Sequence, residues 1–361
     1  MTYQQFPVVG PFQGHVDNIP TPHNPANSFD EIVNFICRKG RFQTRPKMVN
    51  FGAPPDGAIV RTFRTYSDVQ NFLHTLVLTT ANAYSLTAGA VYNLMTYPGG
   101  IVNLTGTSLP YGVQIMNGRV YFSNGSVQIL YADGESSLKD STAPGAARFL
   151  AQNASHLIAA YMTEPEPGVV GSQVFQQRVR WSKSGDPNDW TAPGSGENDL
   201  LDVPDGITGL VTLGRNTLIT RTNGLTIMTP TGIGTNPFAF ENVSISPLGL
   251  GNRYPYSLAQ YADFAVFISN SDIHLIDAGL GIKSIGGKAK KKIMRQLGDA
   301  SGDVVIGWPV AQLGPGIDYL SYWLTIPGAE ATWIYNFDED NWQQFESSLG
   351  RPTFVGMTTI G

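Results

Sequence analysis

Residues 206–232 read GITGLVTLGRNTLITRTNGLTIMTPTG, and they contain three short apolar segments separated by tight turns. Segments of this length rich in Val, Ile, Leu and Thr are typical of β-strands. Residues 254–281, YPYSLAQYADFAVFISNSDIHLIDAGLG, repeat the order: an opening strand, a very apolar strand, and a third strand one turn later. The two stretches therefore predict the same antiparallel meander.

Asn-Gly pairs supply several of the turns. Such pairs suit type I′ turns, because both central residues of that turn need a positive φ. Asn117-Gly118, Asn124-Gly125 and Asn223-Gly224 each stand between two predicted strands, as does Ala262-Asp263. A sustained helical period is missing from the chain, and the best helix candidate, residues 288–298, is either one short helix or a charged loop. The fold class is thus all-β.

Openings of further meanders recur along the chain at a spacing of roughly 35–60 residues. They begin near residues 69, 112, 146, 207, 256 and 303, and a terminal strand begins near 352. Units of three or four strands at this spacing are typical of β-propeller blades, which bury both faces against their neighbours. We expect a single propeller of about seven blades, or of six if residues 59–95 belong partly to the first blade. Two stacked β-sandwiches are the alternative, and they would need a linker near residues 164–173.

The two ends of the chain are expected to differ from the middle. Residues 1–30 hold five prolines and read as an extended N-terminal arm. In this arm Phe6, Val8, Val9 and Phe12 either contact a neighbouring subunit or belong to a floppy terminus. Residues 31–361 form the propeller, and we expect a last strand at 353–358 to pair with the first hairpin and close the ring, which would remove two free sheet edges.

Composition limits the classes of function. Charged residues make up 14% of the chain and the net charge is −5, which argues against a protein that binds nucleic acid by itself. A single cysteine, Cys37, excludes an internal disulfide framework. No signal peptide and no apolar run of about 18 residues is visible, so we expect a chain without a membrane span, made in a cytosol.

Catalytic motifs are missing from the sequence. His15, His23, His74, His156 and His274 are isolated and lack the spacing of metal ligands. Residues 181–192, WSKSGDPNDWTA, resemble the Asp-box turn of sialidases, but the spacing is one residue short, and a polar turn above a packed Trp190 explains them better. We therefore expect no enzyme, no cofactor and no metal site.

A basic cluster is the strongest charge feature of the chain. It comprises Lys283, Lys288, Lys290, Lys291, Lys292 and Arg295. The cluster is either a solvated connection between blades or a contact with an acidic partner surface or with DNA phosphates.

Five stretches in order resemble the tail-nozzle and tail-tube proteins of bacteriophages. They are NFICRKGRFQTRPKMVNF (34–51), RVRWSKSGDPNDWTAP (178–193), DGITGLVTLGRNTLITRTNGLTIM (205–228), SLAQYADFAVFISNSDIHLIDAGLGIKSIGGK (257–288) and WIYNFDEDNWQQFE (333–346). The resemblance covers roughly residues 30–360. Nozzle proteins of short-tailed phages generally carry large insertions or a platform domain, and from the residues of this sequence we expect neither here.

The resemblance implies a structural virion protein, made in the host cytoplasm and built into the tail as a nozzle, collar or adaptor ring. Its implied partners are further copies in a homo-oligomeric ring, other tail or portal-adjacent proteins, and genomic DNA that passes without specific binding. Two alternatives stay open. A carbohydrate- or receptor-binding propeller would use Trp181, Trp190, Trp308, Trp323, Trp333 and Trp342 as sugar platforms. A glycoside hydrolase would need two carboxylates about 5–10 Å apart.

Overall fold

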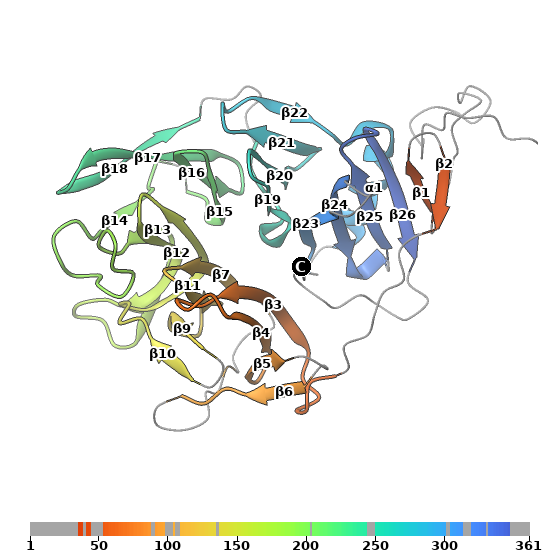
Figure 1. Ribbon diagram of the computed structural model, residues 1–361. Coiled ribbons are helices and arrows are strands. Elements are labelled where there is room, and N and C mark those ends of the chain that lie inside the picture. The colour runs from red at the N-terminus through yellow and green to blue at the C-terminus, as the bar shows by residue number, and fades with distance from the viewer. Residues whose placement is uncertain are drawn as a thin grey trace, which may run out of the picture.

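Six four-stranded antiparallel sheets follow one another around a centre and form the blades of a β-propeller in the computed structural model (Figure 1). The structure describes residues 35–38, 41–44, 53–87, 91–97, 104, 109–134, 137–202, 204–243, 250–300, 304–312, 319–329 and 331–346. Within each blade the strands pair in chain order, so each connection between paired strands is a hairpin.

The blades are named A to F along the chain. Blade A contains β3 (Val60–Ser67), β4 (Leu73–Thr79), β5 (Ala83–Thr87) and β6 (Val91–Leu94), and blade B contains β7 (Gly112–Met116), β8 (Arg119–Ser123), β9 (Leu130–Ala132) and β10 (Leu138–Asp140). Blade C contains β11 (Ala146–Asn153), β12 (His156–Pro165), β13 (Ser172–Trp181) and β14 (Gly196–Asp199), and blade D contains β15 (Ile207–Leu213), β16 (Asn216–Arg221), β17 (Leu225–Ile233) and β18 (Asn236–Asn242). Blade E contains β19 (Ala259–Gln260), β20 (Phe264–Ile268), β21 (Ile273–Asp277) and β22 (Ile282–Ser284), and blade F contains β23 (Ile306–Gln312), β24 (Tyr319–Ile326), β25 (Ala331–Asn336) and β26 (Asn341–Glu346).

The blade count is six, the lower of the two numbers that the sequence allowed. The segment near residue 69 does not open a blade, because it lies in the turn between β3 and β4 and in β4 itself. Residues 59–95 therefore belong to the first blade. The terminal strand near 352 and the closing strand at 353–358 lie outside the described residues, as does the arm at 1–30 with Phe6, Val8, Val9 and Phe12.

Apolar layers between the blades make the core. Strand β20 shows why its sequence, FAVFI, does not alternate between apolar and polar residues. Ala265 and Phe267 pack in the layer shared with blade D, whereas Val266 and Ile268 pack in the layer shared with blade F. Because both faces of the sheet are covered, every residue along such a strand is free to be apolar.

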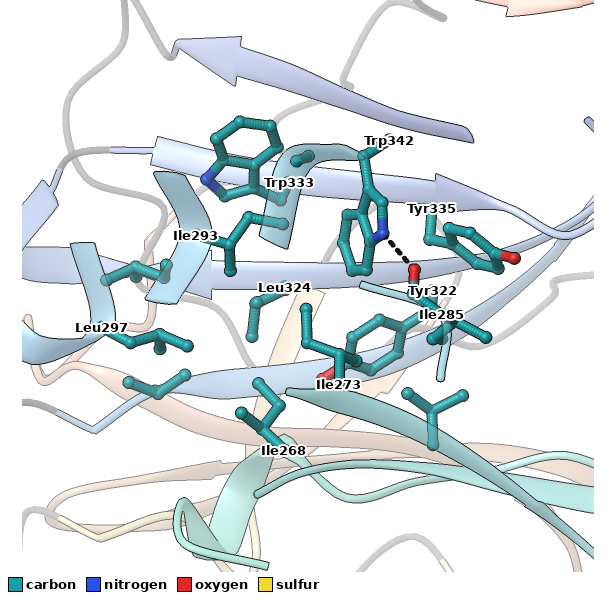
Figure 2. Packing of buried hydrophobic residues seen from close by; sticks show 14 of the residues in the cluster. Ile268, Ile273, Ile285, Ile293, Leu297, Tyr322, Leu324, Trp333, Tyr335 and Trp342 are labelled. Atoms are coloured by element: carbon teal, nitrogen blue, oxygen red, sulfur yellow. Dashed lines mark hydrogen bonds between the residues drawn. The ribbon is translucent and has the colours of Figure 1, made fainter. Parts of the chain in front are cut away.

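The layer between blades E and F also receives the helix α1 (Lys290–Asp299), preceded by the short 3₁₀ helix η3 (Gly287–Ala289). One of the two forms expected for residues 288–298, a short helix, is thus observed. Ile293 and Leu297, one turn apart, are buried against blade residues that include Ile268 and Leu324 (Figure 2). Trp342 closes the layer by donating its indole N–H to the carbonyl of Ile285 at 2.6 Å.

The expected turns are only partly correct. Asn117 and Gly118, between β7 and β8, both have a positive φ, which confirms a type I′ geometry. Asn223 and Gly224 do not, so the type I′ prediction is wrong there. The loop between β16 and β17 is longer than two residues, and Arg221 N–H donates to Gly224 O at 2.9 Å to close it. A longer loop removes the need for two residues with positive φ.

The first hairpin forms a separate two-stranded sheet of β1 (Phe35–Arg38) and β2 (Arg41–Thr44). It lies beside β26 at the outer side of blade F (Figure 1). Among the described residues, no helix has the length and apolar character needed to span a bilayer.

Candidate functional site

A pocket of about 340 Å³ lies where the inner strands of several blades meet near the propeller axis. Residues 109, 148 and 304–305 reach it from the start of blade B, from β11 of blade C and from the start of blade F. The connection between blades D and E adds Arg253–Tyr256, and α1 adds Leu297 and Gly298. The complete lining is Leu109, Arg148, Arg253, Tyr254, Pro255, Tyr256, Leu297, Gly298, Val304 and Val305. We call this the axial pocket.

Arg148 is the most constrained charged group of the axial pocket. Its Nε donates to the hydroxyl of Tyr256 at 2.9 Å. Its guanidinium lies 5.2 Å from the ring centroids of both Tyr256 and Tyr161, and 5.5 Å from that of Phe149. A cation over aromatic faces is attracted by their quadrupoles, so the three rings hold this guanidinium in place.

Tyr161 reaches Arg148 through a local irregularity of the sheet. It lies at a register shift between β12 and β13 and has a φ of 58°. Such a value is costly for a residue with a bulky side chain, and β-bulges of this kind re-aim side chains. Backbone strain of this type collects at functional sites, which makes the surroundings of Arg148 a candidate site.

Contacts with two inner strands hold the segment that carries Tyr256 in place. The 3₁₀ helix η2 (Pro255–Ser257) packs against β15 and β23. Tyr322 donates its hydroxyl to the carbonyl of Ser257 at 2.8 Å, and a Cβ on Gly307 would lie only 2.4 Å from the same oxygen. Glycine at 307 therefore allows the segment to approach β23. Burial raises the pKa of the Tyr256 hydroxyl, so this group keeps its proton at neutral pH.

A second hollow, of about 380 Å³, lies on blade C beside a cluster of ion pairs. The Glu164 carboxylate, 1% exposed, accepts from Arg178 Nη1 at 2.6 Å and from Arg180 Nη2 at 3.1 Å. Arg178 also donates from Nε and Nη2 to both oxygens of Asp199 at 2.7 Å, and this contact lowers the pKa of Asp199. The carboxylates of this cluster are thus committed to arginines, and the cluster braces strands β12, β13 and β14.

Most of the large exposed apolar side chains of the described residues lie in two regions. The blade A surface consists of Val69, Phe72 and Leu73 in and after the β3–β4 turn and of Val91 at the same end of the sheet. The blade C surface consists of Val169, Val170, Val174 and Leu201 around the β12–β13 turn and the second hollow. Phe72 is 62% exposed and Val170 is 99% exposed. Exposed apolar side chains that lie near one another are candidates for interaction sites.

The predicted basic cluster lies on β22, η3 and α1, and its members do not share one role. Lys290 pairs with Asp272 at 2.8 Å, and the Lys292 ammonium lies 5.6 Å from the ring centroid of Trp333. Lys291 and Arg295 are exposed on the helix, Lys283 is exposed on β22, and Lys288 on η3 is half-buried. Contact with a partner therefore stays a prediction for the exposed members.

The other candidates from the sequence have structural roles. His74 contacts Asp68 at 2.9 Å, and His274 contacts the hydroxyl of Ser269 at 3.1 Å. Asp186 Oδ1 accepts from Asn188 N–H at 3.0 Å above a buried Trp190, as expected for a polar turn. In the ranges that the structure describes, no group of three His, Cys, Asp or Glu side chains is arranged to hold a metal ion. The six tryptophans are all buried, so none presents a face to a sugar.

Comparisons with known proteins give fold-level similarity. No family model and no curated protein matches the sequence. Among solved structures, a streptogramin B lyase is 12% identical with a TM-score of 0.46, covering 81% of this chain and 84% of the other. The WD40 domain of Neurospora crassa Pan2 is 12% identical with a TM-score of 0.45, covering 81% and 80%. AztD from Citrobacter koseri is 8% identical with a TM-score of 0.39, covering 82% and 87%. These similarities carry no argument about function.

Sequence reasoning missed the axial pocket entirely. Arg148 stands in AARFLAQN and Tyr256 in RYPYSLA, and neither segment carries a recognised motif. A weak signal was present, because an arginine inside an otherwise apolar opening strand must find a partner when the strand is packed. The partner, Tyr256, lies 108 positions further along the chain and is brought to Arg148 only by the arrangement of the blades.

Proposed function

We propose that the chain is a structural protein of a bacteriophage tail that assembles with further copies of itself into a nozzle, collar or adaptor ring around the DNA channel. The five sequence stretches that resemble tail-nozzle and tail-tube proteins, in the same order, support the assignment to a bacteriophage tail. The observation that carries the assembly is the presence of two exposed apolar surfaces on different blades, A and C, which blade B separates.

Two different surfaces suit a ring better than a two-fold dimer. In a cyclic ring each subunit presents one surface to the subunit before it and another to the subunit after it, whereas a two-fold dimer uses one surface twice. The low charge content of the chain, 14%, also favours extensive subunit contacts, because interface cores are depleted of charged residues. We therefore assign the blade A surface of one copy to the blade C surface of the next.

A mixing experiment tests this assembly. Phe72→Lys removes the blade A surface and Val170→Asp removes the blade C surface, and both side chains are exposed enough that the core is untouched. By native mass spectrometry and electron microscopy we expect rings from the natural chain, monomers from each variant alone, and dimers from the mixture, because each variant keeps one intact surface. Ile233→Lys, also exposed but outside both surfaces, is the matched control and should still form rings.

Two results would contradict the proposal. One is a natural chain that stays monomeric at about 100 µM, a concentration at which an interface of about −7 kcal/mol is largely occupied. The other is a mixture of the two variants that gives no dimer. Electron microscopy of the particle tests the location, since the proposal requires propeller-sized density in a ring of the tail.

A second consequence concerns DNA. An acidic chain should repel phosphates and leave the passing genome mobile. We expect no tight binding of duplex DNA by the purified protein at about 150 mM salt. Tight binding would contradict the proposal that the ring is a channel through which DNA passes without being held. The exposed members of the basic cluster would then be the first residues to test.

A further inference from the structure

We propose that the axial pocket binds a small organic anion, with a carboxylate or phosphate group on the Arg148 guanidinium and a flat apolar body against the pocket walls. This site goes beyond the assembly role proposed above and does not depend on it. Its volume of about 340 Å³ lies within the range of roughly 300–1,000 Å³ that small-molecule sites occupy.

The charge of the lining selects an anion. Two arginines, Arg148 and Arg253, are among the lining residues of the axial pocket, and none of the lining residues is an aspartate or glutamate. Arg253 donates from Nη1 to the side-chain oxygen of Asn270 at 2.7 Å, and this acceptor is neutral. In a chain with a net charge of −5, a pocket with two cations and no acid is a distinct feature.

The position of Arg148 favours one mode of contact. Nε is occupied by the Tyr256 hydroxyl, and the aromatic rings of Phe149, Tyr161 and Tyr256 surround the guanidinium. The two terminal nitrogens are the remaining donors, and they can form the paired hydrogen bonds that a carboxylate or phosphate accepts. Because the rings already fix the side chain, binding costs little further rotamer entropy.

The remaining walls fit an apolar body. Leu109, Pro255, Leu297, Val304 and Val305 are apolar and come from four separate segments of the chain. Val305 is buried, and the aromatic side of Tyr254 completes this part of the lining. A ligand that carries an anionic group on a ring would therefore bury its ring while its charge meets Arg148.

Calorimetry on the full chain tests the site with four probes: phenyl phosphate, benzoate, inorganic phosphate and benzyl alcohol. Phenyl phosphate or benzoate should bind. Inorganic phosphate and benzyl alcohol should each bind at least about tenfold more weakly, because inorganic phosphate lacks the apolar ring and benzyl alcohol lacks the anionic group. Arg148→Gln should weaken the binding of the aromatic anion by about tenfold or more. Arg215→Gln, an exposed arginine of blade D outside the pocket, should leave binding unchanged.

A second variant guards against a folding defect at Arg148. Tyr256→Phe keeps the ring but removes the hydroxyl that accepts from Arg148 Nε, and it should weaken the same probe by about two- to tenfold. The proposal is overturned if neither aromatic anion binds to the natural chain. It is also overturned if the folded Arg148→Gln and Tyr256→Phe variants both bind the probe as tightly as the natural chain.

Discussion

Arg221 offers the sharpest test of how two neighbouring blades are held together. Its side chain is 1% exposed at the end of β16 in blade D. Nη1 donates to Asp202 Oδ1 at 2.9 Å and Nη2 donates to the carbonyl of Leu200 at 3.1 Å. Nε lies 2.8 Å from Asp205 Oδ1, an ion-pair distance without hydrogen-bond alignment. Since residues 200–205 connect blade C to blade D, this one guanidinium fixes the connection between them.

Replacement of Arg221 by methionine keeps most of the side-chain volume and removes the charge. Asp205, 10% exposed, then stays buried without its cation. Removing one partner of a buried ion pair costs about 3–5 kcal/mol. A chain of this length has an unfolding entropy of about 0.8 kcal/mol/K, so the melting temperature should fall by about 4–7 °C. The melting temperature of Arg221→Lys should lie between those of the natural chain and of Arg221→Met, because lysine keeps the charge but cannot make the forked contacts.

Differential scanning calorimetry measures both variants against a matched control. Arg215 lies in the turn that precedes β16 and is exposed, and its side chain donates a hydrogen bond from Nη2 to Pro230 O at 3.2 Å. Arg215→Met should therefore change the stability by no more than about 0.5 kcal/mol. The reasoning is refuted if Arg221→Met melts within 1 °C or so of the natural chain, or if Arg215→Met loses as much as Arg221→Met does.

Three further predictions follow from the described contacts. Burial lowers the pKa of His274, so protonation favours the unfolded chain and the stability of the fold should fall as the pH drops below about 6.5. In urea titrations, the loss of stability between about pH 7.5 and pH 5.5 should be smaller for His274→Gln than for the natural chain. A Cβ on Gly251 would lie 2.3 Å from a backbone oxygen, so Gly251→Ala should lower the melting temperature by several degrees, while Gly224→Ala, with open space around its Cβ, should not. Ile293→Ala should cost about 2–5 kcal/mol in chemical denaturation because the side chain is fully buried, and Lys291→Ala on the exposed side of α1 should cost less than about 0.5 kcal/mol.

The sequence alone predicted the architecture well because its signals are local. Each blade is a set of hairpins, and short apolar runs with turn residues between them specify a hairpin without any distant partner. Strands such as FAVFI, apolar on both faces, further require two covering layers, and this is what the propeller supplies. The blade count was less certain, since the turn at 68–72 and the strand β4 read equally well as the opening of a blade.

The axial pocket and the two apolar surfaces depended on tertiary structure. Arg148 and Tyr256 are 108 positions apart, and they meet only because blade C and the connection before blade E face the same axis. Val174 and Leu201 likewise line one hollow from different segments of the chain. Neighbours in the sequence determine which strands form. Which side chains from distant segments meet is determined by the arrangement of the blades around the axis, and a local sequence pattern does not encode that arrangement.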